Sequence, residues 1–278
     1  MAGHLEGRVV LVTGAAGGFG RLVAQKAADR GAHLVCGDLD EAGAQATAES
    51  IVAAGGRALA RATDVTRLED LRALVAAAEE RFGTVDVLVN NAGVMPLAFH
   101  ADHEAAHDAW LRCIDVNVKG VLNGIVAVHD AMMARGRGHV VNVSSIYGNF
   151  PVAGAGVYGA TKAAVNFLSE SLRVESRGSI KVTVVKPTGV PGTGLSRGVV
   201  NPAAVVGILG HNAEAYGRQL EAWAAGQLPA DETDPEGIGY AVLDPEHLAE
   251  QILHVMDQPW GVSISELTVR AAGDGYVL

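Results

Sequence analysis

The sequence predicts one doubly wound α/β domain, in which a seven-stranded parallel sheet carries helices on both faces. Three observations lead to this fold class. Short apolar runs alternate with longer amphipathic stretches, as in successive βαβ units. A glycine-rich turn at Gly14 follows the first apolar run directly. Apolar residues make up 49% of the chain and charged residues 19%, which suits a protein with a sizeable buried core.

Seven apolar runs are expected to form the strands. Many are rich in valine, as expected for strands that helices cover on both sides. Up to Lys186, the gaps between them are long enough for the crossover connections that parallel strands need. The expected strands are Arg8–Thr13, His33–Asp38, Arg57–Ala62, Val85–Asn90, Gly138–Ser144, Lys181–Lys186 and Ser263–Arg270.

Six longer stretches are expected to form the helices that cover the sheet. Their apolar residues recur at helical spacing, and alanine, a strong helix former, is frequent in them. The expected helices are Phe19–Arg30, Glu41–Ala54, Leu68–Phe82, His103–Arg135, Val157–Ser176 and Pro245–Met256.

The regular rhythm stops after Lys186. Residues 189–244 contain several prolines, many glycines and the acidic stretch Asp231–Glu236, with a helical piece at Ala213–Ala225 but no further strand. Long segments of this kind in compact domains often form lids or binding loops. We therefore expect residues 1–278 to form one domain, with an insertion at about 189–244 lying over one end of the sheet.

Composition excludes several classes of partner. A formal net charge of −10 argues against nucleic acid and against an anionic membrane surface. Cys36 and Cys113 lie far apart, which is compatible with a reducing compartment. The first residues lack the pattern of a signal peptide, and no apolar run reaches the roughly 18 residues of a membrane span. The expected location is the cytoplasm.

The glycine-rich turn predicts a phosphate-binding site. Gly14, Gly17, Gly18, Phe19 and Gly20 lie between an apolar strand and an alanine-rich helix. Glycines allow a sharp turn and let a pyrophosphate approach the main-chain N–H groups, and the helix N-terminus adds unpaired donors. The strand–turn–helix context indicates a dinucleotide site of the Rossmann type.

Asp38 ends the second expected strand and favours NAD over NADP. Its carboxylate can accept hydrogen bonds from both hydroxyls of the adenosine ribose, and it would repel a 2′-phosphate. Neither the turn nor the residues after Asp38, beginning with Leu39, supply an Arg or Lys for such a phosphate. The alternative is that Asp38 only caps the next helix.

Two further strand ends point toward the same cofactor. Asp64 and Val65 follow the third strand, where they could reach the adenine, although Asp64 is nearly as well suited to capping the helix at Leu68. Asn91, Ala92 and Gly93 follow the fourth strand, where small residues let the backbone approach the cofactor. In isolation they could also be ordinary turn residues.

Tyr158, Lys162 and Ser145 predict the reaction. Tyr158 and Lys162 are four residues apart, so a helix places them on one face. A phenol with a pKa of about 10 is a poor base at neutral pH, and a nearby ammonium lowers that pKa. Ser145 ends the fifth strand, where its hydroxyl can bind a substrate oxygen. This set suits hydride transfer at a carbinol carbon, with the proton passing through Tyr158.

These motifs together resemble the short-chain dehydrogenase/reductase family over about residues 5–187 and the final helix and strand. The motifs are Thr13-Gly14-x-x-x-Gly18-x-Gly20, Asn90-Asn91-Ala92-Gly93, Asn117, Ser145 and Tyr158-x-x-x-Lys162. The resemblance implies that Tyr158 is the acid/base, Ser145 the substrate anchor and Lys162 a ligand of the nicotinamide ribose. It also implies that Asn117 holds a water in a proton relay. The glycines also fit the spacing of the larger epimerase-like branch, but the modest length favours the compact branch.

The segment after the sixth strand departs from the family pattern. The family usually has Pro-Gly there, whereas this chain has Pro187 followed by Thr188. Pro187, Val190 and Thr193 are expected to contact the cofactor, with Thr193 at its amide. The resemblance further implies a homotetramer, or a homodimer, built partly on the long helices after His103 and Val157.

Two further groups of side chains are candidates for a substrate pocket and for a metal site. Met95, Tyr147, Phe150 and Leu195 are expected to line the substrate pocket with Ser145, because the resemblance places them near the nicotinamide, although each could equally be core. Ile146 and Val152 are further candidates. The histidines at 100, 103 and 107 share one helix face, but solvated histidines explain them better than a metal site, and we expect none.

The sequence thus predicts an NAD-dependent oxidoreductase that interconverts a secondary alcohol and a ketone. A mostly apolar pocket lining suits a substrate with a hydrophobic or cyclic body. Two alternatives stay open: a reductase of a β-ketoacyl thioester, which the acidic insertion disfavours, and a protein that binds NAD without catalysis, which the complete residue set disfavours.

Overall fold

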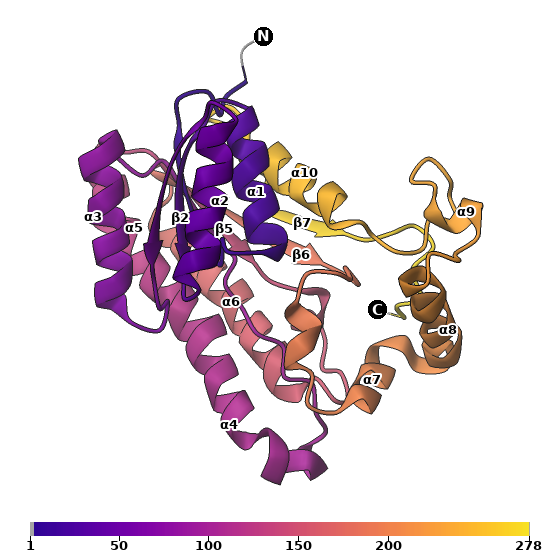
Figure 1. Cartoon of the computed structure of the whole chain (residues 1–278). Helices are drawn as coiled ribbons and strands as arrows, with labels where there is room; N and C mark the ends of the chain where they lie inside the picture. The colour runs from indigo at the N-terminus through magenta and orange to yellow at the C-terminus, as the bar shows by residue number, and fades with distance from the viewer. Residues whose placement is uncertain (1–2, 278) are drawn as a thin grey trace.

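The computed structural model describes residues 3–277 and contains one seven-stranded sheet (Figure 1). The strand order is β3-β2-β1-β4-β5-β6-β7, and all neighbouring strands run parallel. The strands are β1 (Val9–Thr13), β2 (His33–Asp38), β3 (Arg57–Ala62), β4 (Val87–Asn90), β5 (Gly138–Val143), β6 (Ile180–Pro187) and β7 (Glu266–Val269). The order reverses between β1 and β4, so the predicted doubly wound fold is confirmed.

The last strand differs most from its predicted bounds. β7 covers Glu266–Val269, whereas Ser263–Arg270 was expected; the other strand boundaries differ by at most two residues. β7 is one of the two edge strands and, within residues 3–277, pairs only with β6. Before β7, the carbonyl of Ile264 accepts a hydrogen bond from the Thr183 hydroxyl at 2.7 Å. At this residue a side-chain hydrogen bond therefore takes the place of a backbone hydrogen bond between the strands.

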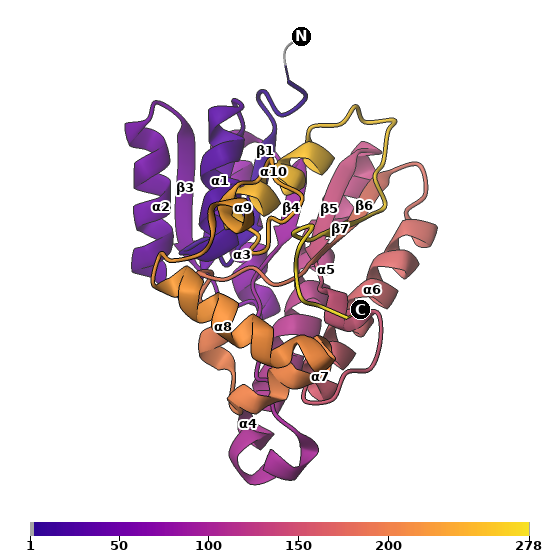
Figure 2. The ribbon, with the colours of Figure 1, turned by 90° about the vertical axis from the view of Figure 1, so that its right-hand side faces the viewer.

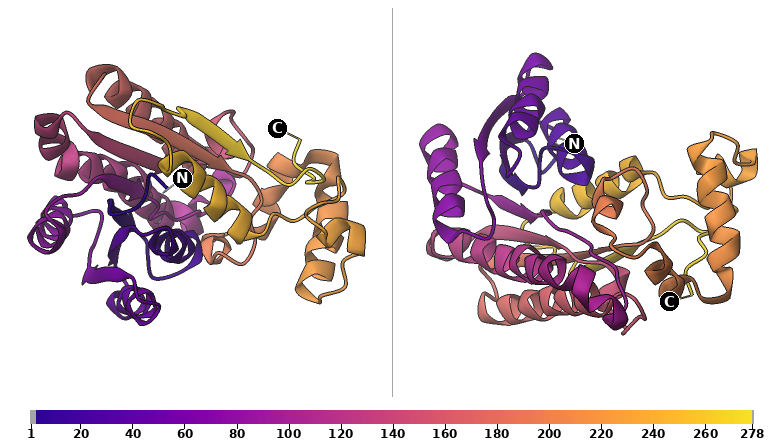
Figure 3. Two further views of the ribbon diagram at one scale, coloured as in Figure 1. Left: turned by 90° about the horizontal axis from the view of Figure 1, so that it is seen from above. Right: turned by 60° about the horizontal axis from the view of Figure 1, so that its bottom comes forward.

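Helices cover both faces of the sheet, as Figure 3 shows from two further directions. One face packs against α1 (Gly18–Asp29), α2 (Glu41–Ala53) and α10 (Pro245–Met256). The other face packs against α3 (Leu68–Phe82), α5 (Gly120–Arg135) and α6 (Gly156–Glu175). Each face has its own apolar cluster, built from the valines of the strands and the alanine, leucine and isoleucine stripes of the helices.

The long helix expected at His103–Arg135 is interrupted, so that prediction was wrong in one respect. It consists of α4 (His103–Ile114), a π-helical turn at Asp115–Lys119, and α5. A π turn adds a residue to the helix and frequently occurs at functional sites. Here the extra residue falls beside Asn117, which is completely buried and lies against the loop after β4.

The insertion after β6 contains short helices and stands to one side of the sheet (Figure 1), so that it faces the viewer in Figure 2. Its helices are α7 (Val206–Leu209), α8 (Ala213–Ala224) and α9 (Ala230–Thr233). All residues of α8 keep part of their surface exposed, unlike those of the covering helices. That the insertion belongs to one domain with the sheet stays a prediction. Among residues 3–277, no helix is long and apolar enough to cross a membrane.

Candidate active site

The turn between β1 and α1 forms a cradle of backbone N–H groups. Gly14 and Gly18 have φ values of +70° and +49°, which other residues rarely adopt. A Cβ atom on Gly20 would lie 2.0 Å from the Gly14 carbonyl oxygen, so a larger residue would force α1 away from β1. Gly17 borders open space, and Phe19 packs its side chain against the core. At Gly17 the turn therefore places no side chain of its own between a pyrophosphate and the N-terminus of α1.

Asn91 and Ala92 join the ends of β1 and β4. The Asn91 amide donates to the carbonyl of Thr13 at 2.9 Å, and the backbone N–H groups of Asn91 and Ala92 donate to the Thr13 hydroxyl. A Cβ atom on Gly14 would lie 2.9 Å from the Ala92 Cα atom. Strands β1 and β4 flank the point at which the strand order reverses, which is where ligands bind in open α/β sheets.

Asp38 lies beside the glycine turn. Its Oδ2 atom accepts a hydrogen bond from the backbone N–H of Ala16 at 2.8 Å, and its Oδ1 atom accepts one from Asp40 at 2.9 Å. The carboxylate is thus fixed at the rim of the cradle, while the neighbouring Leu39 is 65% exposed. Sequence reasoning missed Arg21, whose guanidinium donates to the Ala16 carbonyl and, at 3.1 Å, to the Thr47 hydroxyl. Its only signal was its place one residue after Gly20.

Asp64 and Val65 form a closed loop after β3. The Asp64 carboxylate accepts hydrogen bonds from the backbone N–H and the hydroxyl of Thr66, at 2.9 and 2.8 Å. Asp64 therefore caps its own loop; it does not cap the first turn of α3, for which it was an alternative. The Val65 carbonyl accepts from the Asn123 amide at 2.9 Å, and the Val65 side chain packs at the position of Gly120. These contacts fix the loop in which an adenine contact was expected.

The structure brings Ser145, Tyr158 and Lys162 together at the carboxyl end of β5. Tyr158 and Lys162 lie one turn apart on α6, and both are almost completely buried. The Lys162 Nζ atom is 5.8 Å from the centre of the Tyr158 ring and donates to the carbonyl of Val143 at 2.9 Å. The Ser145 hydroxyl accepts from the backbone N–H of Tyr147 at 3.3 Å. The three side chains thus come from two adjacent elements and face one site.

Burial sets the electrostatics of this site. It raises the pKa of the Tyr158 phenol above its usual value, and the hydrogen bond with Ser145 opposes this increase. Burial also lowers the pKa of Lys162 to about 8, so the ammonium still predominates at neutral pH, although no carboxylate of residues 3–277 forms an ion pair with it. A positive charge this close to the Tyr158 ring stabilises the phenolate whenever the proton leaves.

Asn117 connects the π turn to the reactive helix. Its carbonyl oxygen accepts from the backbone N–H of Val94 at 2.9 Å, and its amide donates to the Val94 carbonyl at 3.0 Å and to the Thr161 hydroxyl at 3.1 Å. Thr161 in turn donates to the carbonyl of Tyr158 at 2.7 Å. A Cβ atom on Gly93 would lie 3.3 Å from the Asn117 Oδ1 atom and 3.6 Å from the Lys162 Nζ atom. Thr161 and the π turn carried no recognisable signal in the sequence.

The loop after β6 closes over the glycine turn. The carbonyl oxygen of Thr193 would be 2.7 Å from a Cβ atom on Gly18, which places the loop directly against the cradle. The Thr193 hydroxyl lies 3.4 Å from the carbonyl of Val190. Pro187 is the last residue of β6, and Thr188 turns away from the cradle to donate to the Asp274 carboxylate at 3.1 Å. A cofactor contact of Pro187, Val190 and Thr193 stays a prediction, for which Thr193 has the best position.

An apolar cluster surrounds the Tyr158 side chain, and we call it the Tyr158 cluster. Its buried members are Leu97, Cys113, Ile146, Tyr147, Val152, Ala155, Tyr158, Ala204, Ile208 and Leu209. Met95 packs against it as expected, and the Tyr147 ring meets the Tyr158 ring edge-on at 5.6 Å. Phe150 is 57% exposed and Leu195 half-buried, and neither joins the cluster. The structure therefore does not place these two predicted pocket residues with the others.

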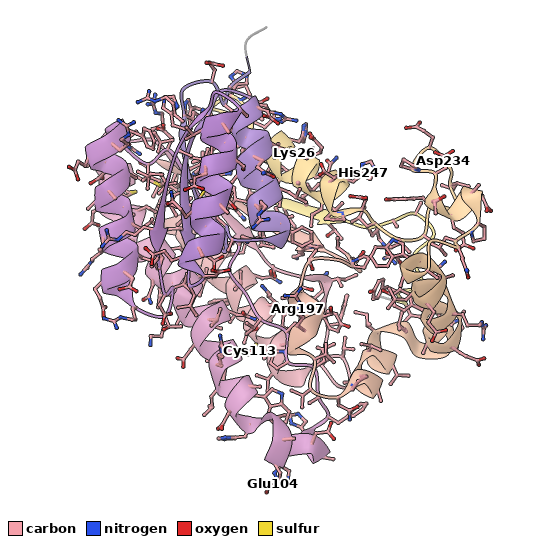
Figure 4. The ribbon with its side chains drawn as sticks, in the orientation of Figure 1. Lys26, Glu104, Cys113, Arg197, Asp234 and His247 are labelled. Carbon is pink, nitrogen blue, oxygen red and sulfur yellow. The ribbon has the colours of Figure 1, made fainter. Side chains whose placement is uncertain are left out.

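Two tyrosines in the cluster were not anticipated. Tyr216 and Tyr276 pack against it from α8 and from the tail after β7. Figure 4 labels Cys113, on α4, and Arg197, on the segment that leads from β6 to α7. The sequence offers no periodic signal for the tyrosines, because the contact joins segments that are 60 residues apart.

The histidines near the start of α4 lie outside the site. His103 and His107 are exposed, at 63% and 67%, and each lies beside the acidic residue that follows it. His100 packs against the ring of Trp110 instead. Within residues 3–277, no three His, Cys, Asp or Glu side chains come together in a way that could hold a metal ion.

Residues 8–202 match the family model described as short chain dehydrogenase. The chain belongs to the short-chain dehydrogenase family. The Tyr158-x-x-x-Lys162 pair, Ser145, Asn117 and the glycine cradle all lie inside the matched range. The range that matches the family model therefore includes all these motifs at the carboxyl edge of the sheet, but only the beginning of the insertion.

Relatives within this family differ in their substrates. "Glycine betaine reductase ATRR" of Emericella nidulans is 35% identical over 96% of this chain, but the chain spans only 19% of that protein. "2,5-dichloro-2,5-cyclohexadiene-1,4-diol dehydrogenase LinX" of Sphingobium indicum is 38% identical over 68% of this chain and 76% of its own length. A solved structure titled "The Closed form of serine dehydrogenase complexed with NADP+" is 29% identical, with a TM-score of 0.74 over 94% of each chain. This short-chain dehydrogenase therefore shares its framework with several oxidoreductases.

Proposed function

We propose that this short-chain dehydrogenase oxidises a secondary alcohol with NAD, or runs the reverse reduction of a ketone. The observation that carries the proposal is the buried set of Ser145, Tyr158 and Lys162 at the carboxyl end of β5. The set lies at the same sheet edge as the glycine cradle, which fits a dinucleotide. Asn117 supports it through Thr161, which bonds the backbone of Tyr158.

Each residue of this set has a separate task. Ser145 donates a hydrogen bond from its hydroxyl to the carbinol oxygen, keeps its own proton and holds the alcohol against Tyr158. The Tyr158 phenolate removes the proton from that oxygen, and the phenol returns it during reduction. Lys162 keeps its positive charge next to the phenolate, while Asn117 fixes the start of the reactive helix against the loop after β4. The nicotinamide, when bound, supplies the acceptor or donor of the hydride.

The preference for NAD rests on Asp38. Its carboxylate lies at the rim of the cradle, where the adenosine ribose of a bound dinucleotide would reach it. A 2′-phosphate would meet this negative charge, although Arg21 lies nearby and the serine dehydrogenase relative is complexed with NADP+. We propose that Asp38 outweighs Arg21, because the guanidinium is already engaged by the Ala16 carbonyl and Thr47.

An Asp38→Ala variant tests this preference. We expect NAD affinity to fall by about 10- to 100-fold, because one charged hydrogen-bond acceptor for the ribose hydroxyls is lost. Affinity for NADP should fall less or rise. Asp40→Ala is the matched control, since the Asp40 carboxylate caps α2 at 3.0 Å from the Gly43 N–H. Titration calorimetry with both cofactors measures the ratio of the affinities for NAD and NADP. If this affinity ratio is unchanged in Asp38→Ala, the proposed contact with the ribose is wrong.

The substrate is proposed to have an apolar or cyclic body. The Tyr158 cluster supports this, because aliphatic and aromatic side chains surround the phenol. The Sphingobium relative, whose name contains a cyclic diol, is consistent with it. The alternative substrate, a β-ketoacyl thioester, is anionic. The acidic residues of the insertion, among them Asp231, Asp234 and Glu236, disfavour it by repulsion.

An assay with both substrate classes separates the possibilities. The unaltered protein is supplied with NAD and a panel of cyclic secondary alcohols, and separately with NADH and a β-ketoacyl thioester, while absorbance of NADH is followed. We expect turnover of one or more alcohols. Exclusive turnover of the thioester would favour the alternative enzyme, and tight NAD binding without any turnover would favour a non-catalytic binding protein.

A homotetramer or homodimer is also proposed. Helices α4, α5 and α6 carry large apolar side chains that are exposed in the single chain, which supports a subunit contact on these helices. The residues are Leu111, Ile114, Leu122, Val126, Phe167 and Val174. A monomeric mass in light scattering would contradict this proposal. The cytoplasmic location stays a prediction from the sequence.

A further inference from the structure

The C-terminal tail after β7 is fixed across the substrate side of the sheet. The Asp274 carboxylate accepts hydrogen bonds from the Arg270 guanidinium at 3.0 Å and from the Thr188 hydroxyl at 3.1 Å. The backbone N–H of Val277 donates to the carbonyl of Ile208, at 3.1 Å. In Figure 2 the tail runs from β7 to a position beside α7. The tail is therefore bound to the loop after β6 and also to the inserted helices.

This path carries Tyr276 into the Tyr158 cluster. The Tyr276 ring occupies the space beside Gly189, where a Cβ atom would lie 2.3 Å from the ring. The Tyr276 hydroxyl lies 3.1 Å from the Tyr216 hydroxyl, and the two rings are 5.6 Å apart. Tyr216 belongs to α8, so the pair also connects the tail to a helix that otherwise has little burial.

Tyr147 brings a third hydroxyl to the same cluster. Its ring contacts the Tyr158 ring and is nine-tenths buried. Within residues 3–277, the Tyr147 hydroxyl has no hydrogen-bond partner. Tyr216 and Tyr276 share one hydrogen bond, in which one phenol donates and the other accepts, so the O–H group of the accepting phenol is still available as a donor. An apolar cluster with unused phenol donors beside the reactive tyrosine is suited to a ligand that brings an acceptor.

The three phenols select for a neutral oxygen. Burial raises the pKa of both Tyr147 and Tyr276, so these hydroxyls stay protonated and remain donors. The expected acceptor is the hydroxyl or carbonyl oxygen of a neutral molecule, because a protonated phenol donates a hydrogen bond but brings no positive charge to a carboxylate.

We propose that Tyr276 of the C-terminal tail and Tyr216 of α8 form, with Tyr147, a second polar contact in the substrate site that recognises a neutral alcohol bearing another hydroxyl or carbonyl oxygen. The inference rests on the proposed function, since it assumes that the first oxygen binds Ser145 and Tyr158. It makes Tyr216 and Tyr276 specificity-determining residues, and it assigns to the tail a role in choosing the substrate.

The test compares substrates that share one ring. The unaltered protein, Tyr276→Phe and Tyr216→Phe are assayed with NAD and cyclohexanol, and with the cyclohexane-1,2-, 1,3- and 1,4-diols. We expect the unaltered protein to prefer one or more diols, and each variant to lose about 3- to 10-fold in kcat/KM for the preferred diol. Turnover of cyclohexanol and affinity for NAD should stay unchanged, because phenylalanine keeps the ring in place.

The test needs a control variant and has outcomes that would contradict the proposal. Tyr240→Phe removes a phenol whose oxygen accepts from the Asp244 N–H at 2.8 Å, outside the Tyr158 cluster, and should change no ratio. Equal losses for cyclohexanol and diols would show a purely structural role and overturn the inference, as would an unchanged diol preference in both variants. If the unaltered protein oxidises no alcohol, the proposed function fails as well.

Discussion

A Tyr158→Phe variant is expected to lose about 10²- to 10⁴-fold in kcat, while its affinity for NAD stays nearly unchanged. The phenol is the only proposed acceptor for the alcohol proton, and the substitution removes only its oxygen. The Tyr158 ring is buried and packs edge-on against Tyr147, so phenylalanine can keep the same packing. Steady-state rates of NADH formation and calorimetric NAD binding measure the two quantities separately.

The control for this variant is again Tyr240→Phe, which changes a tyrosine away from the site and should keep full activity. Circular dichroism spectra of the variants should match the unaltered protein. If Tyr158→Phe retains more than about a tenth of kcat, another group must move the proton, and the role proposed for Tyr158 is wrong.

A Lys162→Met variant should lose activity and also change its pH dependence. Methionine fills a similar volume but brings no charge, so the phenolate of Tyr158 loses the ammonium that lies 5.8 Å from its ring. Oxidation needs the phenolate, and its rate therefore rises with pH up to the pKa of Tyr158. Without the positive charge this pKa is higher, so we expect the acid limb of the profile to move to higher pH and kcat near pH 7 to fall by at least about tenfold.

The pKa of Lys162 provides a second test of its electrostatic role. Because burial lowers it to about 8, the ammonium is lost above that value wherever the Tyr158 phenol still holds its proton, and the unaltered protein and the variant should become more alike in alkaline buffer. Lys186→Met is the matched control: Lys186 is also buried but pairs with Glu266 at 2.8 Å, at the end of β6. A parallel loss at every pH, with no displacement of the profile, would speak against an electrostatic role of Lys162.

The strand and motif framework could be predicted because its causes are local. Valine-rich runs form strands that are buried on both sides, and Gly14 and Gly18 occupy conformations that other residues avoid. The spacing of Tyr158 and Lys162 fixes their relative position on any helix. The fold then brings Ser145 to them, since parallel strands end at one edge. Asp38 ends β2 at this same edge, so its position beside the glycine turn could be predicted for the same reason.

The remaining features depend on contacts between distant segments. The π turn at Asp115–Lys119 follows no composition rule, and it accompanies the burial of Asn117 against Val94. Phe150 was expected in the pocket because it follows the reactive strand closely, yet the chain leaves it exposed. Tyr276 packs against the Tyr158 cluster, and its tail is held through Asp274. Proximity in sequence therefore does not decide which side chains join the Tyr158 cluster, and the pocket residues themselves stay a prediction.

The transfer of a labelled hydride tests the central claim most directly. The unaltered protein is incubated with NAD and a cyclic secondary alcohol that carries deuterium on its carbinol carbon, and the products are analysed by mass spectrometry. We predict equal amounts of ketone and of reduced cofactor, with the deuterium in the nicotinamide, and at least about 100-fold less of both products from Tyr158→Phe in the same time. Ketone formed without deuterium in the cofactor, or no ketone from any alcohol despite saturating NAD, would contradict this claim.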